Sequence, residues 1–172
     1  MLDAIRMPNH AMLWTTITLL IVGTAYGWTA RKTESEQHNT RAKPQSITIH
    51  QEVDFNASPQ RIYDALLDAK QFSAFSTMPA EINRKLGGAF SLFSGHIIGR
   101  NVELIPNKRI VQSWRVVDWP EGVYSIARFE LKPQGPGTHL VFDHTGFPEE
   151  LRDHLAEGWQ DHYWARLKKY LE

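Results

Sequence analysis

The stretch IVQSWRVVDWPEGVYSIARFEL, residues 110–131, carries two of the six tryptophans of the chain, Trp114 and Trp119. Apolar and polar residues alternate on both sides of WPEG at 119–122, as they do in half-buried strands. The proline at the second position of WPEG and the glycine at its fourth suit a type I turn. This stretch therefore predicts a β-hairpin, with strands at 110–117 and 124–131.

Alternation of the same kind predicts further strands on both sides of the hairpin. Three precede it, at 47–55, 89–93 and 96–105, and one follows at 138–144. Turn sequences rich in glycine, proline and asparagine separate most of these segments. The five strands from residue 89 onward follow one another directly, so we expect an antiparallel meander that buries one face.

Helical patterns lie on either side of this meander. Ser58 can cap a helix that begins at Pro59, and a second short helix is predicted at 69–75. From Glu149 onward, apolar residues recur at three- and four-residue spacing, which predicts a helix of about 22 residues that can cover the sheet. We therefore predict an α+β fold in which a curved antiparallel sheet is wrapped around a long C-terminal helix. This helix-grip arrangement commonly leaves space between the helix and the sheet.

The composition excludes several classes of function. Lys and Arg number 19, as do Asp and Glu, so the formal net charge is zero and there is no basic excess for binding nucleic acid. The chain has no cysteine, which excludes disulfides, thiolate metal sites and cysteine nucleophiles. It also has no GxSxG, HExxH or glycine-rich phosphate motif. We therefore expect a non-enzymatic domain without catalytic residues, metal or cofactor.

The N-terminal part of the chain differs from the rest. Residues 11–30, AMLWTTITLLIVGTAYGWTA, carry no charge, and a helix of this length crosses about 30 Å of bilayer core. They predict a single-pass membrane anchor or a cleaved signal peptide. The basic residues after the span favour a cytoplasmic domain, whereas a signal peptide would place the domain in the periplasm or outside the cell. We predict a polar segment at 1–10, a flexible linker at 31–46 and the main domain at 47–172.

Five sequence blocks within this main domain resemble a known family. In chain order they are ASPQRIYDALLD, GGAFSLFSGHIIG, ELIPNKRIVQSWRVVDWPEG, GTHLVFDHTGFP and GWQDHYWARLKKYL. They are similar to the C-terminal domain of the activators of the heat shock protein 90 ATPase, a domain of the START-like SRPBCC superfamily. The resemblance implies a helix-grip fold and a co-chaperone-like domain that docks on a heat shock protein 90-type chaperone. Other members of the superfamily bind small hydrophobic molecules in the cavity between helix and sheet.

Two kinds of site therefore remain open, and each has candidate residues. If a small hydrophobic ligand is bound or transported, the predicted cavity residues are His96, Gln112, Trp114, Arg128, Phe129, Phe142, Trp159 and Tyr163. If a chaperone is the partner, we expect a docking cluster at the loop edge of the sheet, rich in the tryptophan and arginine typical of interface hot spots. Its predicted members are Lys108, Arg109, Arg115, Trp119 and Glu121. Docking is the leading prediction, and ligand binding is the alternative.

Overall fold

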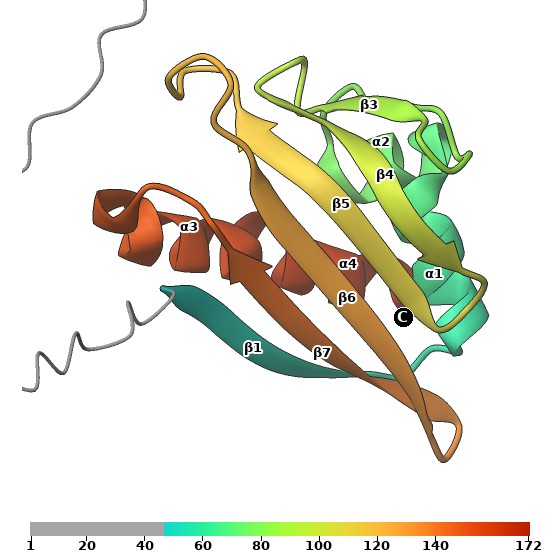
Figure 1. Ribbon diagram of the computed structural model, residues 1–172. Coiled ribbons are helices and arrows are strands. Elements are labelled where there is room, and N and C mark those ends of the chain that lie inside the picture. The colour runs from blue at the N-terminus through green and yellow to red at the C-terminus, as the bar shows by residue number, and fades with distance from the viewer. Residues whose placement is uncertain (1–46) are drawn as a thin grey trace, which may run out of the picture. The chain divides into compact units, whose positions relative to one another are not determined.

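Seven antiparallel strands form one sheet, in the order β1-β7-β6-β5-β4-β3-β2, in the computed structural model, which describes residues 47–172 (Figure 1). The strands are β1 (Thr48–Phe55), β2 (Glu81–Ile82), β3 (Ala89–Leu92), β4 (Ile97–Ile105), β5 (Arg109–Val116), β6 (Ser125–Gln134) and β7 (Gly137–Thr145). From β2 to β7 each strand pairs with the next in sequence, and β1 is the edge strand beside β7. The predicted meander is therefore confirmed.

The helices lie where the pattern places them. Two short helices, α1 (Pro59–Leu67) and α2 (Ala69–Ser76), follow β1. The C-terminal helical stretch consists of η1 (Glu149–Leu151), α3 (Arg152–Gly158), η2 (Trp159–Trp164) and α4 (Ala165–Leu171). Figure 1 shows this stretch lying across one face of the sheet. The α+β helix-grip fold is therefore confirmed.

Local capping explains where the short helices begin. The Ser58 side chain accepts a hydrogen bond from the Arg61 N–H at 3.4 Å, and Pro59 occupies the first helical turn, where its missing N–H costs nothing. Asp68 ends α1 and caps α2, because its carboxylate accepts from the N–H groups of Lys70 and Gln71. One residue therefore separates the two helices.

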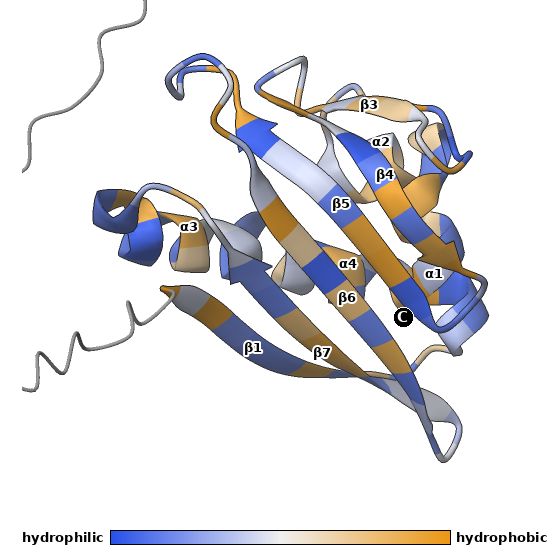
Figure 2. Cartoon of the chain, viewed as in Figure 1, coloured by the Kyte–Doolittle hydropathy of each residue, from blue (hydrophilic) through white to orange (hydrophobic). Residues whose placement is uncertain are grey.

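Alternation along the central strands separates the core face from the outer face. On β5, Ile110, Gln112 and Trp114 are buried, while Val111 and Ser113 between them are only half-buried. The hydropathy colouring of Figure 2 makes the same alternation visible as successive bands along β6 and β7. Apolar burial on one face is what holds the helices against the sheet.

Three local features differ from the predictions. The edge strand β2 is only two residues long, too short for a period-two pattern to be recognised. The hairpin turn hydrogen bond runs from the Val123 N–H to the Pro120 carbonyl, one residue later than predicted. Gly122 has a φ of 78°, which fits the third position of a type II turn, where a positive φ is required. Finally, η2 is a π-helix, and it turns Trp159, Tyr163 and Trp164 all into the core.

The membrane prediction has to be corrected. No helix within residues 47–172 is long and apolar enough to cross a bilayer. The predicted localisation as a single-pass membrane protein is therefore wrong for the part of the chain that the structure describes. The predicted span at 11–30, the segment 1–10 and the linker 31–46 lie outside the described residues.

Candidate functional site

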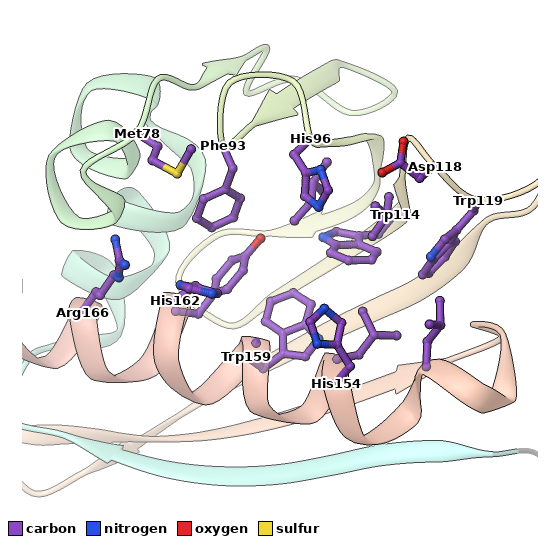
Figure 3. Close-up of a pocket in the computed structure, with 16 residues that line it drawn as sticks. Met78, Phe93, His96, Trp114, Asp118, Trp119, His154, Trp159, His162 and Arg166 are labelled. Atoms are coloured by element: carbon purple, nitrogen blue, oxygen red, sulfur yellow. The ribbon is translucent and has the colours of Figure 1, made fainter.

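A cavity of about 550 Å³ lies between the C-terminal helical stretch and the sheet (Figure 3). This volume is within the range of sites for small molecules. Figure 3 shows Trp114 and Trp119 on the sheet side and Trp159 on the helix side. The rings contact one another, with centroids 5.5 Å apart for Trp114 and Trp119 and 5.6 Å apart for Trp114 and Trp159. The inner wall of the cavity is therefore aromatic.

A buried chain of hydrogen bonds fixes the positions of the tryptophans in the cavity wall. The Trp159 Nε1–H donates to Nδ1 of His144 at 3.0 Å, and the other ring nitrogen of His144 lies 2.7 Å from Oγ of Ser125. The Ser125 hydroxyl donates to the Trp114 carbonyl at 2.8 Å. Because Nδ1 accepts and Oγ already donates elsewhere, His144 carries its proton on Nε2 and donates it to Ser125. The chain ties the helix tryptophan to the strand tryptophan.

His144 is neutral in this position. Its side chain is fully buried, and the loss of solvation lowers its pKa from the ordinary 6.5 to about 3. A histidine that donates to a serine cannot take the proton of that serine, and Ser125 is also fully buried. The pair therefore orients the wall and is not arranged as a nucleophile with its base.

Two buried polar atoms of the wall have no hydrogen-bond partner within residues 47–172. They are Nε1 of Trp114 and the hydroxyl oxygen of Tyr163, and both residues line the cavity. Burial raises the pKa of the Tyr163 hydroxyl above its ordinary value of 10, and the nearby Trp114 N–H opposes this shift. The two groups therefore lie close to each other without meeting the geometry of a hydrogen bond.

One ridge of the helical stretch lines the cavity and was missed as a site from the sequence. His154, Gly158, His162 and Arg166 follow one another at four-residue spacing, which places them on one side of the helix. The three side chains of this ridge surround the cavity on the helix side (Figure 3). Arg166 is held by the C-terminal end of α2, since its guanidinium donates to the carbonyl of Ser76 and to the hydroxyl of Thr77, the residue after the helix. The i, i+4 series was a signal that could have found this ridge.

Phe93 also lines the cavity, and no sequence signal indicated it. Its φ of 53° is unusual for a bulky residue, and the following Ser94 and Gly95 also have positive φ values. This tight turn between β3 and β4 turns the ring inward, where it packs 5.4 Å from the Tyr163 ring. The alternation of residues along a strand does not predict the direction of a side chain that lies in a turn.

Four of the eight predicted cavity residues line the cavity: His96, Trp114, Trp159 and Tyr163. Phe129 and Phe142 are buried behind the wall, with centroids 5.8 Å and 4.3 Å from Trp159.

The other two predicted cavity residues lie elsewhere. Gln112 is buried beside Asn101, to whose Oδ1 it donates at 3.1 Å. Arg128 is exposed and binds Glu130 on the outer face, because it alternates with the inward residues Ala127 and Phe129. Neither residue reaches the cavity.

Two of the predicted docking residues, Trp119 and Arg115, are buried. Trp119 is only 6% exposed, and its ring closes one end of the aromatic wall. Arg115 is also buried, and its guanidinium donates to the carbonyls of Trp119 and Val117 at 2.6 Å and 3.1 Å. Arg115 therefore supports the loop from within, and this support allows a residue beside a Pro-Gly turn to be buried.

The remaining docking residues do not form one cluster. Lys108 and Arg109 lie at the beginning of β5, whereas Glu121 follows its end. An eight-residue strand separates the two ends by about 25 Å, and Figure 1 shows β5 running from one end of the sheet to the other. The prediction that these residues gather at one edge is therefore wrong.

The outer face of β1 and β7 carries ion pairs. His50 lies 2.7 Å from Asp143, and the hydrogen bonds that its ring donates to Asp143 and to Glu52 raise its pKa above 6.5. His139 lies 2.8 Å from Asp54. Within residues 47–172 no group of three histidine, cysteine or acidic side chains could hold a metal ion.

A curved antiparallel sheet that grips a C-terminal helical stretch around an apolar cavity defines a START-like helix-grip domain. The family described as "Activator of Hsp90 ATPase homolog 1-like protein" matches residues 56–172, and the chain belongs to it.

Individual relatives agree with this assignment. The human activator of 90 kDa heat shock protein ATPase homolog 1 is 27% identical over 144 residues, which are 81% of this chain and 43% of that protein. The homolog from Dictyostelium discoideum is 32% identical over 127 residues, 73% of this chain and 33% of that protein. The chain thus spans less than half the length of these two relatives.

A solved structure of an HSP90 activator from Plasmodium falciparum has the same fold. Its TM-score is 0.70 at 26% sequence identity, and the match covers 73% of this chain and 96% of that one. The match therefore extends over nearly all of that solved chain.

Proposed function

We propose that residues 47–172 form a co-chaperone-like domain that binds a heat shock protein 90-type chaperone. The observation that carries the proposal is the match to almost the whole chain of the solved HSP90 activator, at a TM-score of 0.70. The names of the human and Dictyostelium relatives support the same partner. Binding alone is proposed, because the chain spans less than half of these relatives and stimulation of the ATPase belongs to the whole proteins.

The turn between β4 and β5 is the surface that we propose for docking. Lys108 is exposed there and Arg109 is half-buried beside it. Burial alone would raise the pKa of Glu130, but hydrogen bonds from Arg128 and Arg109 lower it overall, so this carboxylate stays charged and orients both guanidinium groups. Arg109 also lies 3.3 Å from Glu103, so its charge is largely balanced, and the exposed Lys108 is the cation that we propose meets an acidic patch on the partner. Charges of this kind chiefly control the rate of association.

Lys108→Glu is expected to weaken binding of the purified chaperone about three- to tenfold at low salt, because it turns an attraction into a repulsion. The difference should shrink when salt is added, since exposed charges are screened. Isothermal titration calorimetry at two salt concentrations measures both effects. Glu121→Lys, at the other end of β5, is the matched control and should leave the affinity unchanged. Equal affinities for Lys108→Glu and the unsubstituted chain would exclude this surface.

The cavity supports a second function, the binding of a small hydrophobic molecule. Its volume of about 550 Å³ is larger than the voids of an ordinary close-packed core, and its inner wall is aromatic. A probe that absorbs where tryptophan emits would quench Trp114 and Trp159 when it is bound in contact with them. Uncharged N-phenyl-1-naphthylamine is a suitable probe, because its emission rises in apolar surroundings.

Gly158→Leu is expected to reduce the affinity for this probe at least about tenfold, since a Leu side chain is large enough to fill part of a small-molecule site. A Cβ at Gly158 meets no atom within 4 Å, so a larger side chain can enter the cavity without a clash at its base. Probe emission and tryptophan quenching in a titration of the full chain give the affinity. Ala165→Leu, on the exposed side of α4, is the control. Equal probe binding by both variants would place the probe outside the cavity.

A further inference from the structure

The cavity has a positively charged side chain in its lining. Arg166, the last residue of the helix ridge, is half-buried there, although arginine in folded proteins is mostly exposed. Its guanidinium donates to the Ser76 carbonyl and, at 3.0 Å, to the Thr77 hydroxyl. Both acceptors are neutral. These two bonds therefore fix the position of the guanidinium without balancing its charge.

The guanidinium of Arg166 still has donors to offer. Both of its hydrogen bonds come from Nη1, and Nε and Nη2 have no hydrogen-bond partner within residues 47–172. None of the ion pairs in this part of the chain includes Arg166. A carboxylate accepts two parallel hydrogen bonds from one guanidinium, and such bonds are stronger than those between neutral groups. The free edge of Arg166 therefore suits a carboxylate.

The cavity is long, and Arg166 lies at one end of it. The helix residues of the lining run from Leu151 to Arg166, and the ridge from His154 to Arg166 alone extends about 15–18 Å. Figure 3 shows Arg166 beside Met78 at one end of the lining and Trp119 at the other end. An elongated apolar molecule with a negative charge at one terminus fits this arrangement.

The other polar residues of the lining indicate which way such a molecule would lie. Asp118 is exposed and lies near Trp119, away from Arg166 (Figure 3). Its negative charge disfavours an anion at that end of the cavity. The three histidines of the lining are exposed and carry no negative charge in either protonation state. The anionic head therefore fits at Arg166 and not at the opposite end.

We propose that Arg166 binds the carboxylate of a single-chain aliphatic acid, whose chain lies along the cavity toward Trp119 (Figure 3). The proposal rests on the second proposed function, binding of a small hydrophobic molecule in this cavity. It names the class of ligand, the residue that binds its head and the direction of its chain.

A matched pair of ligands separates the charge of the head from the fit of the chain. Octanoate carries the carboxylate, and octanamide has the same chain and nearly the same shape without the charge. Isothermal titration calorimetry of the full chain at pH 8, where histidine side chains are ordinarily neutral, gives both affinities. The full chain is expected to bind octanoate about tenfold more tightly, because a hydrogen bond between charged groups is the stronger kind.

Arg166→Gln is expected to abolish this preference, so that the two ligands bind within about twofold of each other. The ratio compares two ligands on one variant, so a general loss of cavity affinity cancels. Arg166→Lys should keep part of the preference, since lysine retains the charge but not the planar fork. Arg152→Gln, at the start of α3, removes one positive charge outside the cavity lining and should leave the preference unchanged.

The outcomes separate the two levels of the proposal. Equal affinity of the unsubstituted chain for both ligands would overturn the carboxylate site while leaving a cavity that binds hydrophobic molecules. An Arg152→Gln variant that loses as much of the preference as Arg166→Gln would also overturn it, since net charge would then be the cause. A preference in Arg166→Lys no larger than in Arg166→Gln would contradict a charged contact at this position. If neither ligand nor N-phenyl-1-naphthylamine binds the folded chain, ligand binding and the carboxylate site both fall.

Discussion

Trp159→Ala is expected to lower the free energy of unfolding by about 3–5 kcal/mol, in the range found for deletion of large aromatic side chains from cores. Trp159 is 2% exposed, and its ring centroid lies 4.1 Å from that of Tyr163 and 4.3 Å from that of Phe142. Alanine would enlarge the cavity and leave Nδ1 of His144 without its donor. Urea denaturation followed by circular dichroism measures the loss.

Trp159→Phe is the matched control for this large effect. It keeps a ring in contact with Phe142 but removes the indole N–H that His144 accepts. We expect a smaller loss of about 1–3 kcal/mol, the range for a buried acceptor left unpaired. A loss below about 1 kcal/mol in Trp159→Ala would contradict a structural role for this ring, because ordinary surface changes are of that size.

Stability is expected to fall on acidification between about pH 6.5 and pH 3, and His144 is the main reason that the structure offers. Its pKa is about 3 in the folded protein and 6.5 when it is exposed on unfolding. Within this window the unfolded chain binds a proton that the folded chain does not, so lower pH favours unfolding. The contribution of His144 is therefore complete above pH 6.5 and decreases by up to about 1.4 kcal/mol for each pH unit below it.

His144→Gln isolates this effect, since glutamine does not titrate but still has an acceptor for Trp159 and a donor for Ser125. The raised pKa of His50 acts in the opposite sense: its contribution is present below pH 6.5 and is lost as the pH rises through the folded pKa. His50 is present in both proteins, so the difference between the two pH profiles belongs to His144. Parallel profiles would show that His144 is not the group that titrates.

Periodicity was sufficient for the architecture because burial on one face is repeated along every long element. Trp114 lies on the same face of β5 as Ile110 and Gln112, and this alternation predicted that its side chain points inward. Trp119 was misplaced because a Pro-Gly turn usually lies at the surface. Arg115 is buried and donates a hydrogen bond to the Trp119 carbonyl of this loop. The residue preferences of turns do not predict such a contact.

The site depended on pairings between distant parts of the chain. Lys108 and Glu121 are close in the sequence, but the extended strand β5 lies between them and places them at opposite ends of the sheet. The hydrogen-bond chain from Trp159 through His144 to Ser125 joins a helix to two strands. The spacing of residues within one element cannot show such a convergence. The i, i+4 ridge from His154 to Arg166, by contrast, could have been read from the sequence.

Binding of the chaperone itself is the most direct test of the proposed function. The ¹⁵N–¹H spectrum of the full chain would be recorded while purified heat shock protein 90 is added. We expect saturable changes that concentrate on the turn around Lys108 and leave the indole resonance of buried Trp114 unchanged. A spectrum that does not change at chaperone concentrations of about 0.1–1 mM, where even weak specific complexes form, would contradict the assignment of this domain as a chaperone partner.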